Sequence, residues 1–224
     1  MASVLVPDTV YQPPRAAVSA QAAGPAPLDN LKGVIVRATK IQIQNNHKTD
    51  LLGRKEPADI YPIILVASDQ SQQPAQLGSP GIFNGIFNGD DLPIADPGFT
   101  VERSLGAIPS FLDIHVLVMR SLQHQRDVAQ AIQAALQSTE GQAAMTALKT
   151  IVTGANPIAG TAVAMGTSIL TIVTKVLSQA KDEQIFYGVT SLEREPDNLG
   201  IGVTHVFTDD RNALVNIQVV GLYH

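Results

Sequence analysis

Residues 111–119, FLDIHVLVM, carry the pattern that decides the fold class. Apolar residues occupy every second position, namely Leu112, Ile114, Val116 and Val118. Asp113 and His115 fall on the opposite face, so the stretch is predicted to be a β-strand with one buried and one exposed face. Helical periodicity follows within a few residues, which indicates that helices are inserted directly after this strand.

The segment from about residue 122 to about residue 182 is predicted to be a helical hairpin or a three-helix segment. Residues 122–138 repeat apolar residues at a spacing of four, which is typical of an amphipathic helix. Thr139 and Gln142 have the spacing of a capping box and predict the start of a second helix. The pair Asn156–Pro157 predicts the start of a third helix.

The third predicted helix is unusually poor in charge, since no charged residue lies between residues 150 and 174. Its apolar positions have a heptad-like spacing at Ile158, Ala162, Met165, Ile169, Ile172 and Val176. The small residues Gly160, Ala164 and Gly166 allow close helix packing, in protein or in lipid. The uncharged stretch also reaches the ~20 residues that a membrane-spanning helix needs. Burial in the protein, a subunit interface and insertion of residues 142–177 into lipid all remain open.

Five more stretches have strand patterns: residues 34–44, 60–67, 185–192, 199–207 and 213–220. In the first of them the alternation shifts by one near Thr39, which predicts a β-bulge. Pro62 lies in the second, and because proline has no N–H to donate, this strand is predicted to lie at a sheet edge or to carry a bulge. The last three are joined by short turns and are predicted to form an antiparallel meander.

A long irregular region from residue 69 to residue 109 contains the direct repeat GIFNGIFNG at residues 81–89. Loops of this length are uncommon in compact domains and are often functional. Phe83 and Phe87 in the repeat are therefore candidates either for a lid over the core or for contact with a partner.

Residues 1–30 are predicted to form an extended N-terminal arm, and residues 31–224 a single β-sandwich domain. The arm is rich in Ala and Pro, and its apolar residues are Val4, Val6 and Val10 around Tyr11. It is predicted to be either a flexible tail or a segment that adds as a strand to a neighbouring subunit's sheet. No signal peptide pattern is visible, so a cytoplasmic location or export by a non-classical route is expected.

The composition excludes several classes of function. Charged residues make up only 16% of the chain and the net charge is -5, so no nucleic-acid partner is expected. Cysteine is absent, which removes disulfides and thiolate chemistry. The chain has no phosphate-binding loop, dinucleotide fingerprint, HExxH helix or GxSxG elbow, and its histidines lack zinc-ligand spacing. We therefore expect a protein that is not an enzyme and identify no small-molecule substrate.

The order of elements resembles that of bacterial C2-like β-sandwiches with an α-helical insertion. The resemblance rests on pattern over residues 31–221, in the pieces KIQIQNNHKTD, EPADIYPIILVASD, FLDIHVLVM and ILTIVTKVLSQAKDEQIFYGV. The predicted fold class is thus α+β, an antiparallel β-sandwich of the C2-like or immunoglobulin-like kind with inserted helices.

This resemblance implies a calcium site, because loops at one end of C2 domains collect aspartates that bind calcium and bridge to anionic lipid. The candidates by position are Asp59, Asp69, Asp90, Asp91 and Asp96, with Asp50, Asp209 and Asp210 as further possibilities. Calcium takes six to eight oxygen ligands, and adjacent loops can supply them. These aspartates are scattered and stand in turn-forming sequence, so structural roles are the alternative. No other cofactor is expected.

Two functions are compatible with these observations. The first is a non-catalytic structural or interaction protein that forms a homo-oligomer or docks into a larger complex. The second is a membrane-active protein that inserts its apolar helical segment into lipid, with or without calcium bound at the acidic loops.

Overall fold

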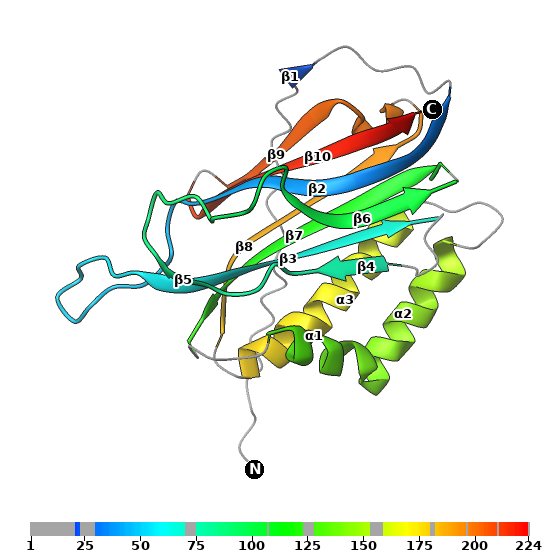
Figure 1. Cartoon of the computed structure of the whole chain (residues 1–224). Coiled ribbons are helices and arrows are strands. Elements are labelled where there is room, and N and C mark those ends of the chain that lie inside the picture. The colour runs from blue at the N-terminus through cyan, green and yellow to red at the C-terminus, as the bar shows by residue number, and fades with distance from the viewer. Residues whose placement is uncertain are drawn as a thin grey trace.

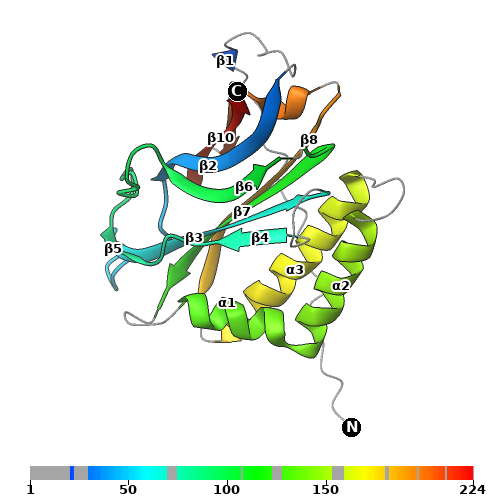
Figure 2. The same cartoon turned by 45° about the vertical axis from the view of Figure 1, so that its right-hand side comes forward.

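The computed structural model describes residues 21–22, 30–69, 75–106, 108–122, 128–152, 159–179, 182–195, 197–209 and 211–223. Two antiparallel β-sheets face each other, and helices cover the outer face of the second sheet (Figures 1 and 2). The predicted α+β sandwich with inserted helices is therefore confirmed.

The first sheet has the strand order β1-β9-β10-β2-β6. Its strands are β1 (Gln21–Ala22), β2 (Leu31–Ile43), β6 (Phe99–Leu105), β9 (Val203–Thr208) and β10 (Ala213–Tyr223). In the ladder between β2 and β10, Asn216 pairs with Lys40 and Ile217 pairs with Ala38. Thr39 is the residue left over, so the predicted bulge is confirmed.

The second sheet has the order β4-β3-β7-β8, with β5 also paired to β3. Its strands are β3 (Ala58–Ser68), β4 (Ala75–Gly78), β5 (Phe83–Ile86), β7 (Phe111–Ser121) and β8 (Glu183–Glu193). The strands β4, β5 and β6 all come from the stretch predicted to be irregular. With four residues each, β4 and β5 leave little periodicity in the sequence.

Pro62 does not place its strand at an edge, because β3 lies inside the second sheet. Pro62 pairs with Val118 of β7 on one side. On the other side, β5 pairs with residues 58–60 of β3 and β4 pairs with residues 64–67. The proline thus falls in the interval between two short strands, where the ladder needs no donor from it.

The helical insertion consists of α1 (Val128–Gln137), α2 (Thr139–Val152) and α3 (Ala159–Gln179), between β7 and β8. The apolar face that α3 buries contains Ile169, Leu170, Val173 and Leu177. Ile169 of the predicted seam lies in this face, whereas Ile172 of the seam is only half-buried. Among the helices as described, none is both long enough and apolar enough to cross a membrane.

Both faces of β7 are buried, so the predicted exposed face is wrong. One face, with Leu112 and Ile114, packs in the core between the two sheets. The other face, with Leu117 and Met119, packs in a second core under the helices. Asp113 and His115 are fully buried there, because the helical layer covers the face that the alternation had assigned to solvent.

The predicted C-terminal meander is also wrong in its first strand. The strand β8 pairs with β7 in the second sheet, whereas β9 and β10 form a hairpin in the first sheet. A single 3-10 turn (η1, Asn198–Gly200) connects the two sheets, and β9 begins only at Val203. Turn residues between two strands therefore mark a change of sheet here and not a hairpin.

The turn between α1 and α2 predicts a measurable capping effect. The Ser138 hydroxyl accepts a hydrogen bond from the Gly141 N–H (3.0 Å) and donates one to the Ala135 carbonyl (2.7 Å). The residue that caps α2 is thus Ser138 and not Thr139. Replacing it by alanine is expected to lower the free energy of unfolding by about 1 kcal/mol in urea denaturation. Thr139→Ala, at an exposed position, should cost less than half as much, and an equal or larger cost would contradict the assignment.

Candidate functional site

Residues 44–57 connect β2 to β3 as a protruding hairpin (Figure 1). Thr49 and Lys55 form a bridge near its end. The Asp50 N–H donates to the Arg54 carbonyl (2.9 Å), and the Asp50 carboxylate accepts the N–H of Arg54 (2.8 Å). The same two side chains form an ion pair (3.4 Å). Asp50 therefore builds the turn at the end of the hairpin.

Two strongly exposed leucines form the tip of this turn. Leu51 and Leu52 have relative exposures of 106% and 73%. The Leu52 N–H donates to the Asp50 carboxylate (2.8 Å), which fixes the backbone of the pair. An apolar pair held outward on a built turn is a typical interaction surface, whereas a single exposed leucine needs no explanation.

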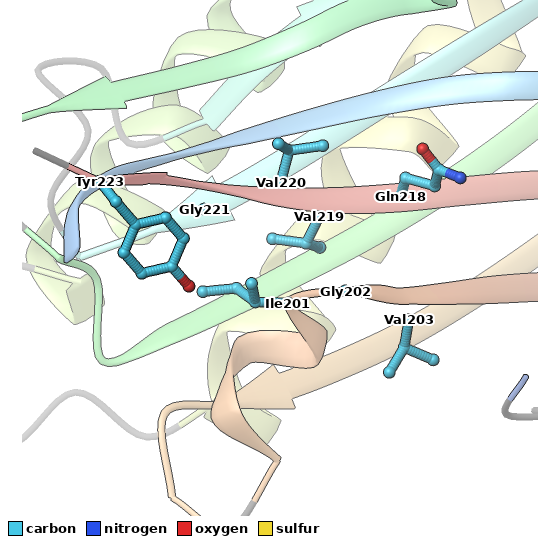
Figure 3. Close-up of a pocket in the computed structure, with 8 residues that line it drawn as sticks. All are labelled: Ile201, Gly202, Val203, Gln218, Val219, Val220, Gly221 and Tyr223. Carbon is cyan, nitrogen blue, oxygen red and sulfur yellow. The ribbon is translucent and has the colours of Figure 1, made fainter. Parts of the chain in front are cut away.

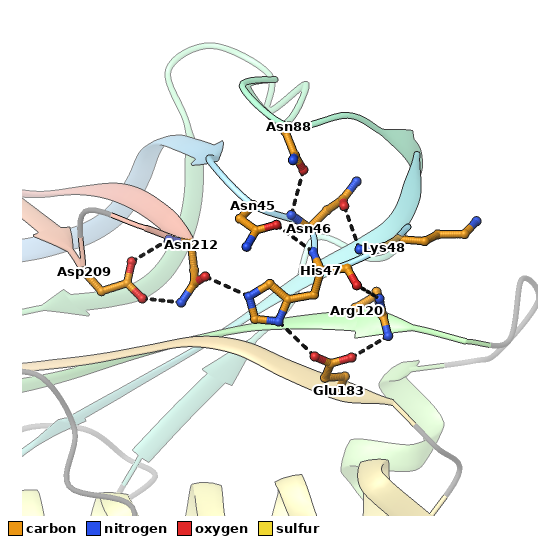
Figure 4. A network of polar contacts seen from close by, with 9 residues as sticks. All are labelled: Asn45, Asn46, His47, Lys48, Asn88, Arg120, Glu183, Asp209 and Asn212. Atoms are coloured by element: carbon orange, nitrogen blue, oxygen red, sulfur yellow. Dashed lines mark hydrogen bonds and ion pairs between the residues drawn. The ribbon is translucent and has the colours of Figure 1, made fainter. Parts of the chain in front are cut away.

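Asn46 anchors the hairpin at its base (Figure 4). Its side chain is fully buried and donates to the carbonyls of Glu56 and Ile86, both at 2.8 Å. Its backbone N–H donates to the Asn88 side chain (2.9 Å). One amide thus ties together both strands of the hairpin and the neighbouring β5 loop.

His47 connects the same base to both sheets (Figure 4). Its Nδ1 lies 2.9 Å from Glu183 Oε1 at the start of β8, and its Nε2 lies 2.7 Å from Asn212 Oδ1 before β10. Arg120 of β7 donates to the His47 carbonyl and to Glu183. His47 itself has a positive φ of 59°, which turns the chain sharply at this point.

The partners of the His47 ring are both acceptors. The Asn212 amide nitrogen donates to Asp209 (2.6 Å), so its oxygen faces the ring. Glu183 offers only a carboxylate oxygen. Both ring nitrogens therefore face oxygen acceptors. The polar groups of this network hydrogen-bond to one another and so hold the base of the hairpin in place.

The five aspartates predicted as calcium ligands do not converge. Asp59 and Asp69 belong to opposite ends of β3. Asp59 accepts the Gly85 N–H (3.2 Å), and Asp69 accepts the N–H and hydroxyl of Ser110 (2.8 and 2.5 Å). Each therefore holds a local loop in place.

The other three acidic candidates are exposed. Asp90 accepts the Phe87 N–H (2.9 Å), Asp91 pairs with Lys40 (3.3 Å), and Asp96 precedes a cis proline. Within the ranges that the structure describes, no three His, Cys, Asp or Glu side chains gather in a way that could hold a metal ion.

The predicted interface residues are dispersed. Val4, Val6, Val10 and Tyr11 lie outside the described residues, and Gly160 lies in the first turn of α3. Ala164 is exposed on α3, and Gly166 is buried against β7. Phe83 packs on the first core, whereas Phe87, its counterpart in the repeat, is 52% exposed.

A buried polar group lies between α3 and the second sheet. His115 Nδ1 and the Tyr187 hydroxyl are 2.9 Å apart, and the Thr167 hydroxyl of α3 lies 3.2 Å from the same oxygen. A Cβ at Gly166 would lie 2.3 Å from His115 Nε2. The glycine is therefore required for α3 to pass over the histidine ring.

Burial moves the ionisation of two side chains under the helices. Desolvation lowers the pKa of His115 from 6.5 to about 4, so the ring is neutral at pH 7. Desolvation raises the pKa of Asp113 from 3.8 to about 7, and Glu193 adds to the rise while Ser191 opposes it. The helical layer thus covers one carboxyl group whose charge is costly at neutral pH.

No protein-family model matches the chain, and no curated protein matches its sequence. The fold is therefore assigned as an antiparallel β-sandwich with inserted helices, without a family.

Sequence reasoning missed the leucine tip and its polar base. The feature that marks the tip is an apolar pair enclosed by turn-forming Asp50 and Gly53 in an otherwise polar stretch. The base brings together residues from distant parts of the chain, such as His47 and Glu183, so no local sequence pattern predicts it.

Asp113→Asn should change how stability depends on pH. Between pH 3.8 and about 7 the folded protein binds more protons at Asp113 than the unfolded chain does, so stability falls as pH rises through that interval. The variant removes this loss. Relative to the wild type it should gain more than about 1 kcal/mol in free energy of unfolding on going from pH 4.5 to pH 8.

His115 acts in the opposite direction, because the unfolded chain binds more protons between pH 4 and 6.5. Urea denaturation of Asp113→Asn should therefore show stability rising from pH 4 to 6.5 and then levelling. Asp91→Asn, at an exposed carboxyl, is the control and should follow the wild-type curve. If the stability of Asp113→Asn depended on pH in parallel with that of the wild type, the raised pKa assigned to Asp113 would be refuted.

Proposed function

We propose that this protein is a non-catalytic assembly protein whose N-terminal segment adds as a strand to the first sheet of another copy. The observation that supports the proposal is the position of β1. Gln21 and Ala22 pair with Thr204 and Val203, so these two residues add to the edge of the first sheet at β9. Every copy offers the same edge, and the same pairs can form between two chains as within one.

The β9 edge has room for a longer strand. Beyond the two residues paired with β1, no other strand lies beside the outer edge of β9 within the described ranges. Unpaired edges of this kind are templates for strand addition. In the register of β1, residues 17–20 would face the four remaining residues of β9, and the apolar Val4, Val6 and Val10 further along the arm would contact the neighbouring copy beyond that strand.

Charge does not oppose such an association. The net charge is only -5 over 224 residues, so copies repel one another weakly. The assembly is proposed to be a homo-oligomer or part of a larger protein complex. The C2-like assignment remains a proposal that rests on the order of strands and the position of the helices.

Lipid insertion by residues 142–177 receives no comparable support. The apolar side chains that insertion would need, Ile169, Leu170, Val173 and Leu177 among them, are buried in the second core. Releasing them would expose the sheet that they cover.

The mass of the protein in solution tests the proposal. Full-length protein should form a discrete oligomer by light scattering at micromolar concentration. Deletion of residues 1–27 should weaken this association at least tenfold and leave the circular dichroism spectrum of the sandwich unchanged. Replacing Val4, Val6 and Val10 by aspartate should have the same effect without shortening the chain. A full-length monomer, or an oligomer that survives the deletion, would contradict arm exchange.

A further inference from the structure

A shallow apolar hollow lies at the end of the first sheet that is remote from the hairpin (Figure 3). Its volume is about 300 Å³, at the lower end of the roughly 300–1,000 Å³ of small-molecule pockets. Ile201 and Val219 are buried at its floor, and Val203, Val220 and Tyr223 are more exposed around it.

The hollow exists because the strand pairing stops early. The ladder between β9 and β10 ends at the pair Thr204 and Gln218, whereas β10 continues to Tyr223. Only a single bridge, between Ile201 and Val219, follows it. Gly202 and Gly221 line the hollow without adding side chains to it.

The hollow and the leucine tip lie at opposite ends of one strand. Tyr223 pairs with Leu31 at the start of β2, and the hairpin follows the last residue of β2, Ile43. Thirteen residues of β2 separate the two ends by ~40 Å. The tip of a chain therefore cannot reach its own hollow, but it can reach that of another copy.

The charges around the two features are complementary. The hairpin carries Lys48, Arg54 and Lys55 against Asp50 and Glu56, which leaves an excess of one positive charge. The turn that leads into the hollow carries Glu193, Glu195 and Asp197 against Arg194, which leaves an excess of two negative charges. Opposite charges of this kind fix the orientation of an approaching partner.

We infer that the Leu51–Leu52 tip of one copy inserts into the hollow of a second copy, with Lys55 facing the acidic turn. The contact joins different surfaces on the two chains, so copies add head to tail and form a ring or a filament. This inference rests on the proposed self-assembly. Val203 lines the hollow and also pairs with Ala22 of β1, but the leucine tip, Tyr223 and the acidic turn take no part in arm exchange.

The test is a double substitution at the tip, Leu51→Asp with Leu52→Asp. Both side chains are solvated, so the fold should persist in circular dichroism. Head-to-tail association should weaken at least tenfold, as measured by light scattering at tens of micromolar protein. The rings or filaments should also be lost in electron microscopy. Val220→Asp at the hollow should give the same loss. Leu105→Asp is the matched control, because Leu105 is 62% exposed and lies on β6 at the opposite edge of the sheet.

A charge exchange tests the orientation. Lys55→Glu and Glu195→Lys should each weaken the association, and the two together should restore it. Failure of the double variant to recover would refute the proposed contact between Lys55 and the acidic turn.

Two outcomes would separate this inference from the proposed function. An oligomer that is lost on deleting residues 1–27 but unchanged by the tip substitutions would refute the tip contact and leave arm exchange standing. A tip variant with unchanged mass that no longer sediments with vesicles of phosphatidylcholine and phosphatidylserine would assign the tip to lipid and overturn the inference. A monomeric full-length protein would refute both proposals.

Discussion

The burial of both faces of the second sheet is the constraint on which the rest of the structure depends. Every residue of β3 is buried, and so is almost every residue of β7. Strands of this kind need an apolar cover on each side. The first sheet provides one cover and the helical insertion provides the other, because Ile63, Leu65 and Leu117 would otherwise face water. The insertion is therefore a structural layer of the fold.

The second core also explains the glycine at position 166 of α3. Gly166 passes over the ring of His115, which bonds to Tyr187 and through it contacts Thr167 of the same helix. Directional hydrogen bonds specify one position for a helix more strictly than apolar contacts do, since apolar packing tolerates sliding. Of the small residues predicted to allow close helix packing, Gly166 serves a helix-to-sheet contact around a polar group, whereas Ala164 is exposed.

The sequence was informative wherever the determining pattern is local. The three helices and the bulge at Thr39 follow from periodicity within a few residues. The sheet to which β8 belongs could not be predicted, because its partner β7 lies across the whole insertion. Pro62 led to the prediction of an edge strand, because the two short strands that pair with β3 on either side of the proline have too few residues to be recognised. The scattered aspartates were attributed to a metal site only through resemblance, and their hydrogen bonds assign them to turns.

The stiffness of the hairpin decides what its leucines can contribute. Asn46 and His47 fix its base to both sheets, so docking of the tip orders few new groups and loses little conformational entropy. Burying Leu51 and Leu52 stabilises a contact by about 1.5–3 kcal/mol each, whereas association costs roughly 4–15 kcal/mol in lost freedom. One tip in one hollow is therefore weak alone. Such a contact becomes effective when a second link, such as the arm on the β9 edge, already holds the copies together and raises their local concentration.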